Sequence, residues 1–256
     1  MCYDDQAQVP IPHGEQHPAH GVDVVLTASD GNQFAAFHAT PDHTSSTCVL
    51  IYPDVRGLHQ FYKDLAMRFA HGGIPALAID YFGRTAGLTS RAEPFEFMPH
   101  VQQMTVESFS RDVHAGLNYL RSQHGHDARV FVVGFCMGGS LSIVTGTNAD
   151  FAFAGLIAFY AGMSRPLGSR GTALDYAPDV RSPLLGLFGG DDQGIPQSQV
   201  EQLDLALDQA NVEHQIIVYP NAPHSFFDRR AEQYAAESAD AWQRILHFMG
   251  ESTPNT

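Results

Sequence analysis

The chain has few cysteines, one lysine and no long apolar run. Its 256 residues include three cysteines and a single lysine, Lys63. Three scattered cysteines do not make a disulfide framework, a usage typical of a reducing compartment. No run of about 18 consecutive apolar residues predicts a membrane span. The first residues also lack the basic and apolar regions of a signal peptide. We therefore expect a cytoplasmic protein.

Basic residues are scarce as well. The chain has 28 acidic and 14 basic residues, with a net charge of −14. Affinity for phosphate backbones comes largely from basic patches, so this balance disfavours nucleic acid as a partner. The same charge disfavours adherence to an anionic membrane. We expect a small-molecule partner, and the sequence leaves a monomer and a homodimer equally open.

The hydrophobic pattern alternates between strands and helices. Apolar or alternating runs predict strands over 22–28, 33–38, 47–52, 75–80, 129–133, 154–160, 183–188 and 214–219. Helical spacing predicts helices over 60–71, 105–122, 197–209 and 230–249, with a further short one from 140. This alternation is typical of an α/β fold with a mostly parallel central sheet flanked by helices.

We expect one such domain over 21–250, an irregular N-terminal arm over 1–20 and a C-terminal tail over 251–256. Two connections, 81–104 and 162–182, are long for a compact domain. Both follow the carboxyl ends of predicted strands, where α/β sheets bind ligands. They are therefore candidates for the walls of a pocket, with plain surface insertions as the alternative.

The segment Gly134-Phe135-Cys136-Met137-Gly138-Gly139 directly follows a predicted strand and precedes a helix-compatible stretch. A sharp strand-to-helix turn of this kind raises one side chain at the carboxyl edge of the sheet, as in the nucleophile elbow of α/β hydrolases. The helix N-terminus beneath the turn favours a thiolate over a thiol. A buried structural cysteine is the alternative, but the glycine context favours a nucleophilic Cys136.

A cysteine nucleophile needs a base, and the base needs an acid to orient it. Asp191 and Asp192 follow the predicted strand over 183–188, and His224 follows the strand over 214–219. Nucleophile, acid and base thus occur in the chain order of α/β hydrolases. Each aspartate alone could be a turn former, but the order of all three favours a triad.

Three motifs now carry a resemblance: GFCMGG around Cys136, GGDDQGIP around Asp192 and YPNAPHSFFD around His224. From about Val22 to Met249 the chain resembles the dienelactone hydrolase family. The resemblance implies a Cys-Asp-His triad that opens an enol-lactone or ester through an acyl-enzyme, without a metal or an organic cofactor. Matched by motif, the nucleophile is Cys136, the acid is Asp192 and the base is His224.

The resemblance also implies residues around the triad. The oxyanion would be bound by the backbone amides of Val55 and Met137, consistent with the electrostatic logic of acyl transfer. Asp54 stands where the family has a glutamate that contacts the resting thiol.

Two family arginines that bind the substrate carboxylate are matched only in part. Arg84 corresponds to one of them, with a surface ion pair as the alternative interpretation of this arginine, and the other corresponds to Asp228. Arg56 is a candidate substitute for the missing arginine, and Tyr160 matches a tyrosine near the acyl pocket.

The expected function is hydrolysis of a small lactone or ester, of the carboxymethylenebutenolidase type. A promiscuous arylesterase or phosphotriesterase using the same triad is the main enzymatic alternative. A non-catalytic binding protein of this fold, or a thiol sensor using Cys136, is the alternative from another class.

Overall fold

The computed structural model describes residues 9, 17–43, 45–92 and 94–250. Their centre is an eight-stranded sheet with the strand order β1-β2-β4-β3-β5-β6-β7-β8. The strands are β1 (Ala19–Thr27), β2 (Gln33–Pro41), β3 (Thr47–Tyr52), β4 (Ala76–Ile79), β5 (Arg129–Phe135), β6 (Gly155–Phe159), β7 (Leu184–Gly189) and β8 (His214–Tyr219). Strand β2 pairs antiparallel with β1 and β4, and all other neighbours are parallel. The predicted single-domain α/β fold is confirmed.

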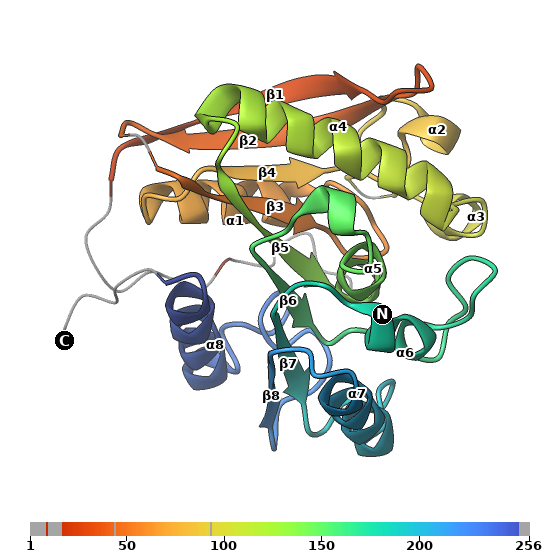
Figure 1. Cartoon of the computed structure of the whole chain (residues 1–256). Helices are drawn as coiled ribbons and strands as arrows, with labels where there is room; N and C mark the ends of the chain where they lie inside the picture. Colours follow the sequence, from red (N-terminus) through yellow and green to blue (C-terminus); the bar gives the residue numbers. More distant parts are fainter. Residues whose placement is uncertain (1–8, 10–16, 44, 93, 251–256) are drawn as a thin grey trace.

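Helices cover both faces of the sheet (Figure 1). The longer ones are α1 (Gln60–His71), α4 (Val106–His124), α5 (Met137–Thr145), α7 (Gln197–Gln209) and α8 (Ala235–Phe248). Helices α1 and α8 share one face, where the rings of Phe69 and Trp242 lie 4.7 Å apart. Helices α4, α5 and α7 lie on the other face. None of the helices formed by the described residues combines the length and apolar character that a membrane crossing requires.

Local sequence explains most of these elements. Strand β3 reads TCVLIY and is buried along its whole length, as expected for a strand covered on both faces. Helix α4 begins with a capping box in which the Thr105 side chain accepts a hydrogen bond from the backbone N–H of Ser108. Helix α1 ends at Gly72 and Gly73, and Gly73 has a φ of 86°, a conformation that suits glycine.

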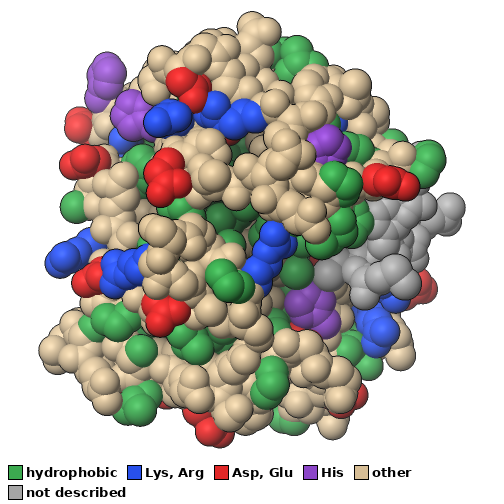
Figure 2. Space-filling view, turned by 90° about the vertical axis from the view of Figure 1, so that its right-hand side faces the viewer, with side chains coloured by type: hydrophobic (Ala, Val, Ile, Leu, Met, Phe, Trp, Pro, Cys, Tyr) green, Lys and Arg blue, Asp and Glu red, His purple; other side chains and the backbone are tan. Residues whose placement is uncertain are grey.

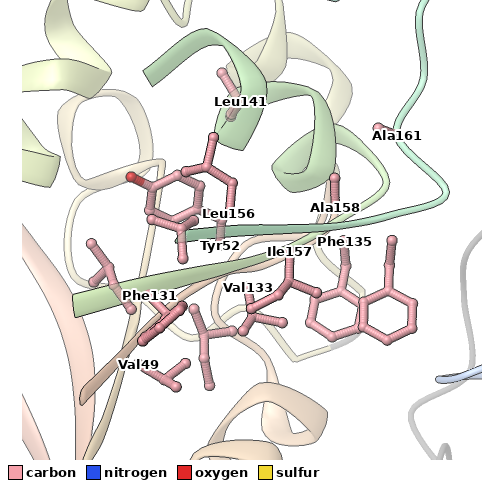
Figure 3. Close-up of a cluster of buried hydrophobic side chains, with 14 of the residues drawn as sticks. Val49, Tyr52, Phe131, Val133, Phe135, Leu141, Leu156, Ile157, Ala158 and Ala161 are labelled. Carbon is pink, nitrogen blue, oxygen red and sulfur yellow. The ribbon is translucent and has the colours of Figure 1, made fainter. Parts of the chain in front are cut away.

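The core is continuous across the middle of the sheet (Figure 3). The rings of Phe135 and Phe159, from the ends of β5 and β6, stack 4.8 Å apart with an interplanar angle of 8°. Leu141 of α5 and Tyr52 of β3 belong to the same buried cluster. This packing holds the first turn of α5 against the ends of β3, β5 and β6.

The two long connections contain short helices that the sequence pattern did not predict. Segment 81–104 contains α2 (Gly83–Ala86) and α3 (Met98–Val101), and segment 162–182 contains α6 (Ala173–Tyr176) and a 3₁₀ turn over Ala177–Asp179. The guanidinium of Arg165 joins the two segments, because its Nη2 donates to the carbonyl oxygen of Val101 at 3.1 Å. Most of the N-terminal arm and the whole C-terminal tail lie outside the described residues.

Candidate active site

The carboxyl ends of the parallel strands place the predicted site residues at one edge of the sheet. Cys136 follows β5, Tyr160 follows β6, Asp192 follows β7 and His224 follows β8. These four strands are consecutive neighbours in the sheet. Parallel pairing therefore brings together residues that are up to 88 positions apart in the chain, the distance from 136 to 224.

Cys136 occupies the turn between β5 and α5. Its φ of 53° and ψ of −110° lie in a region that residues other than glycine rarely adopt. Its backbone N–H donates to the carbonyl oxygen of Phe159 at 3.0 Å, and its carbonyl oxygen accepts from the N–H of Ser140 at 3.1 Å. The turn is thus anchored on both sides, while the cysteine side chain stays partly exposed.

Close backbone approach explains the glycines of the elbow. A Cβ atom on Gly134 would lie 2.2 Å from the carbonyl oxygen of Gly138, and one on Gly138 would lie 2.2 Å from the carbonyl oxygen of Tyr52. Neither position has room for a side chain. These glycines let α5 start directly against β3 and β5, and they give the GFCMGG motif a steric reason.

His224 and Asp192 are in direct contact. The Nδ1 atom of His224 lies 2.6 Å from Oδ2 of Asp192, whose other oxygen accepts from the backbone N–H of Gly194 at 2.8 Å. A carboxylate only accepts hydrogen bonds, so Nδ1 carries the proton and Nε2 is left as the basic nitrogen. The Asp192 side chain is 1% exposed and that of His224 is 28% exposed. Neighbouring Asp191 is exposed, and its Oδ1 accepts from the side chain of Gln193 instead.

Tyr160 packs against the histidine. Its ring centroid lies 4.8 Å from that of His224, and its hydroxyl donates to Oδ2 of Asp228 at 3.0 Å. Tyr160 also has a positive φ, 33°, directly after β6. The residue that the sequence assigned to the acyl pocket therefore lies beside the proposed base.

Asp54 and Arg56 form a buried ion pair after β3. Nε of Arg56 donates to both carboxylate oxygens of Asp54 at 3.2 and 3.3 Å, and Nη2 donates at 3.2 Å. Nε2 of His59 lies 3.8 Å from Oδ1 of the same carboxylate. Burial by itself raises the pKa of Asp54, but the nearby His59 and Arg56 outweigh it and lower the pKa below its ordinary value. His59 was not predicted from the sequence, because it belongs to no motif and lies near Asp54 only in the folded chain.

Arg84 has a different environment from the one expected. Its guanidinium donates to Asp30 at 2.6 Å, to Asp112 at 2.7 Å and to the carbonyl oxygen of Ser108 at 3.3 Å. These contacts connect α2 to the β1–β2 turn and to α4. The guanidinium of Arg84 is thus engaged by two carboxylates and a carbonyl oxygen, and we expect it to stabilise the fold rather than to bind substrate.

Arg165 was not predicted as a site residue, although it lies in segment 162–182, which was predicted as a candidate pocket wall. Burial lowers its pKa, while the negative charge of a Cys136 thiolate acts in the opposite direction. Ser140 connects this segment to the elbow, because its hydroxyl donates to the carbonyl oxygen of Gly162 at 2.5 Å. In Figure 2, hydrophobic side chains gather near the centre of the face that carries α2 and α3, with basic and histidine side chains among them.

No cluster of three or more His, Cys, Asp or Glu side chains that could hold a metal ion occurs within the described part of the chain.

The sheet order, the elbow and the ordered acid and base define the α/β-hydrolase fold, and comparisons with known proteins agree. A model of the dienelactone hydrolase family matches residues 34–253. The chain therefore belongs to the dienelactone hydrolase family, and it is a hydrolase of carboxylic esters or lactones.

Individual relatives cover most of the chain. A protein of Escherichia coli K12 named "Putative carboxymethylenebutenolidase" is 31% identical over 230 residues, which span 86% of this chain and 83% of that protein. A Yersinia pestis protein of the same name is 31% identical over 241 residues, spanning 90% and 88%. A crystal structure titled "Putative Dienelactone Hydrolase", from Klebsiella pneumoniae, has a TM-score of 0.77 at 26% identity and covers 91% of this chain and 100% of that one. A dienelactone hydrolase-like promiscuous phosphotriesterase from metagenomic libraries shares the fold, with a TM-score of 0.70 at 20% identity over 90% and 98% of the two chains.

Proposed function

We propose that this hydrolase opens a small lactone or ester through a covalent acyl-enzyme on Cys136. One observation carries the proposal: the His224–Asp192 hydrogen bond lies at the same sheet edge as the elbow that presents Cys136. A histidine held by a carboxylate through Nδ1 is the arrangement that makes Nε2 a base for a neighbouring nucleophile.

In the acylation step, the Sγ atom of Cys136 attacks the carbonyl carbon, and His224 holds the thiol proton on Nε2. The carbon–oxygen bond to the leaving alcohol breaks, and the imidazolium returns the proton to that oxygen. In a lactone the leaving oxygen stays tethered to the acyl chain. Water then attacks the thioester while His224 takes its proton, which releases the acid and restores the thiol.

The oxyanion would be bound by the backbone N–H groups of Val55 and Met137. Among the described residues neither N–H has a hydrogen-bond acceptor, so both remain available to a substrate oxygen. Met137 is the first residue of α5, where the partial positive charge of the helix N-terminus adds to the effect. Removal of one such donor typically costs about 100-fold or more in kcat.

Substrate recognition in this proposal differs from the one expected from the resemblance. Arg56 forms an ion pair with Asp54, and the Tyr160 ring lies against the ring of His224. A contact between Asp54 and the resting thiol stays a prediction. A cytoplasmic location, a monomeric or homodimeric state and the absence of nucleic-acid and membrane partners also stay predictions.

The test is rapid mixing of the protein with p-nitrophenyl acetate and with an enol-lactone, followed by intact-mass and peptide analysis. We expect an acyl adduct on Cys136 and a loss of most turnover in Cys136→Ser. Cys48→Ser is the matched control, because Cys48 is buried within β3 and burial raises the pKa of its thiol to about 12. Full activity of Cys136→Ser, or no adduct on Cys136, would overturn the proposal.

A substrate panel separates the alternatives. Parallel kcat/KM values for an enol-lactone, a neutral aryl ester and an organophosphate decide between a lactonase and an arylesterase or phosphotriesterase. No turnover of any of them, together with reversible oxidation of Cys136, would instead support a thiol sensor.

A further inference from the structure

Tyr160 is held in an unusual way for a residue that only lines a pocket. It has a positive φ of 33° and is fully buried directly after β6. A backbone in this region costs about 1–3 kcal/mol and persists only where the surroundings enforce it. Its ring lies 4.8 Å from the His224 ring, at an interplanar angle of 55°. The strained backbone thus serves a contact with the proposed base.

Asp228 anchors the far end of the same side chain. Its Oδ2 accepts the Tyr160 hydroxyl at 3.0 Å, and its Oδ1 accepts the backbone N–H of Arg229. Asp228 is 2% exposed, so these bonds form away from bulk water, where charge-assisted hydrogen bonds are strong. Both oxygens of the Asp228 carboxylate accept hydrogen bonds, so this carboxylate is held in place. It fixes the Tyr160 hydroxyl at one end of the side chain, while the end of β6 fixes the Tyr160 backbone at the other.

His224 needs this second support for a geometric reason. The hydrogen bond from Nδ1 to Asp192 fixes the position of that atom, and by itself it leaves rotation of the ring about the bond. A tyrosine ring in contact with the imidazole, tilted at 55° to it, limits this motion and keeps Nε2 aimed in one direction. Misplacement of a catalytic group by about 1 Å can cost about 100-fold in rate.

We propose that Asp228 is a positioning residue that acts through Tyr160 to hold the ring plane of His224. The inference rests on the proposed function of His224 as the base for Cys136. The family resemblance implies a substrate-binding arginine at this position, and the inference explains why this chain carries Asp228 there. Asp228 therefore serves the catalytic histidine in place of a substrate.

The chain offers a control pair at the end of another strand of the same sheet, β8. At the end of β8 the hydroxyl of Tyr219 donates to Oδ2 of Asp240 at 2.8 Å. This pair is also a Tyr–Asp hydrogen bond, but its carboxylate is more exposed and also accepts from Arg244, and its tyrosine ring packs on Phe226 at 5.0 Å. Variants of this pair therefore report the general cost of losing a Tyr–Asp bond in this sheet.

The experiment compares Tyr160→Phe, Asp228→Asn and their double variant with Tyr219→Phe and Asp240→Asn. Two readouts are taken: kcat and KM on p-nitrophenyl acetate, and the rate of Cys136 alkylation by iodoacetamide against pH, followed by peptide mass analysis. We expect Tyr160→Phe and Asp228→Asn each to lower kcat about tenfold with little change in KM. The double variant should be no slower than the slower single variant, since both substitutions remove the same Tyr160–Asp228 hydrogen bond.

The alkylation profile adds a readout that a merely structural role would not move. A loosened His224 stabilises the Cys136 thiolate less, so the midpoint should move upward in the two site variants and stay in place in the controls. The charged or titratable groups around Cys136 and His224 are Asp192 after β7, Tyr160 after β6, Tyr81 after β4 and Arg165 in segment 162–182. Asp228, behind Tyr160, in turn faces the charged or titratable groups of Arg56, Tyr62 and the adjacent Arg229.

Equal kinetics and equal pH profiles in site and control variants would overturn the inference. So would a slow Asp228→Asn beside an unaffected Tyr160→Phe, since the effect would then not pass through the tyrosine. Tyr160→Phe keeps the ring and its packing, so it remains informative if Asp228→Asn folds poorly. Failure of the proposed function looks different, because the wild-type protein would then form no acyl adduct on Cys136.

Discussion

Replacement of Cys136 by glycine should leave a more stable fold than replacement by alanine, which reverses the usual order of these residues. The backbone of Cys136 has φ 53° and ψ −110°. Alanine would retain the cost of this conformation, about 1–3 kcal/mol, whereas glycine would not. Glycine loses more backbone freedom on folding, which costs about 0.5–1 kcal/mol.

The difference leaves glycine ahead by about 1 kcal/mol. The methyl group of alanine offsets little of this, because the side chain of Cys136 is only partly buried. Both variants lack the thiol, so the comparison isolates the backbone. For a chain of this size the glycine variant should melt about 2–4 °C higher than the alanine variant.

Thermal and urea unfolding of both variants measure this difference. Ala206→Gly, in the regular helix α7, is the control, and there glycine should be the less stable by about 1 kcal/mol. If Cys136→Gly were also less stable than Cys136→Ala, the elbow would store no strain, and the strain argument would fail for Tyr160 as well.

Three further predictions follow from the contacts of single residues. Asp192→Asn should lower kcat about 1,000-fold or more with stability nearly unchanged, because the asparagine amide can donate to Nδ1 and favour the wrong tautomer of His224. A loss of less than about tenfold in steady-state kinetics would refute this. Arg84→Gln should leave kcat/KM within about twofold and lower the free energy of unfolding in urea by about 1–3 kcal/mol, because it strips the buried Asp112 of its cation; the reverse pattern would restore a substrate role to Arg84. Burial, with the charge of His124 as a smaller cause, lowers the pKa of His38 to about 4. Stability linked to this group should therefore be full above pH 6.5 and fall by at most about 3 kcal/mol toward pH 4, and His38→Gln should flatten urea-unfolding curves over that range; the same pH slope in both proteins would contradict it.

Several elements have the bounds that the sequence pattern predicts. The structure has β3, β8, α1 and α7 over the predicted residues, because each is a clean apolar or amphipathic run between turn-forming residues. The last helix is the clearest miss. It was predicted over 230–249 but begins at Ala235, since the preceding residues form turns in which the N–H of Arg230 donates back to the carbonyl oxygen of Ser225.

The candidate site divides in the same way. The motif around Cys136 is a local feature and was sufficient to predict the elbow, whereas the choice of Asp192 over Asp191 as the partner of His224 came from the family resemblance. The partners of Arg84 and Arg56 were not predictable. Each arginine pairs with whichever carboxylate the folded chain brings within reach, and no local pattern encodes that distance.

The sequence by itself determined the fold class, the family and the identity and order of the three proposed catalytic residues. These follow from hydrophobic periodicity and short motifs, which act over a few residues. Only the tertiary structure decided that Tyr160 contacts His224 and donates a hydrogen bond to Asp228, and that Arg84 pairs with Asp112 of α4. Such contacts depend on the order of strands in the sheet, which sets distances between residues far apart in the chain. The elbow was therefore readable from the sequence, and its supports only from the fold.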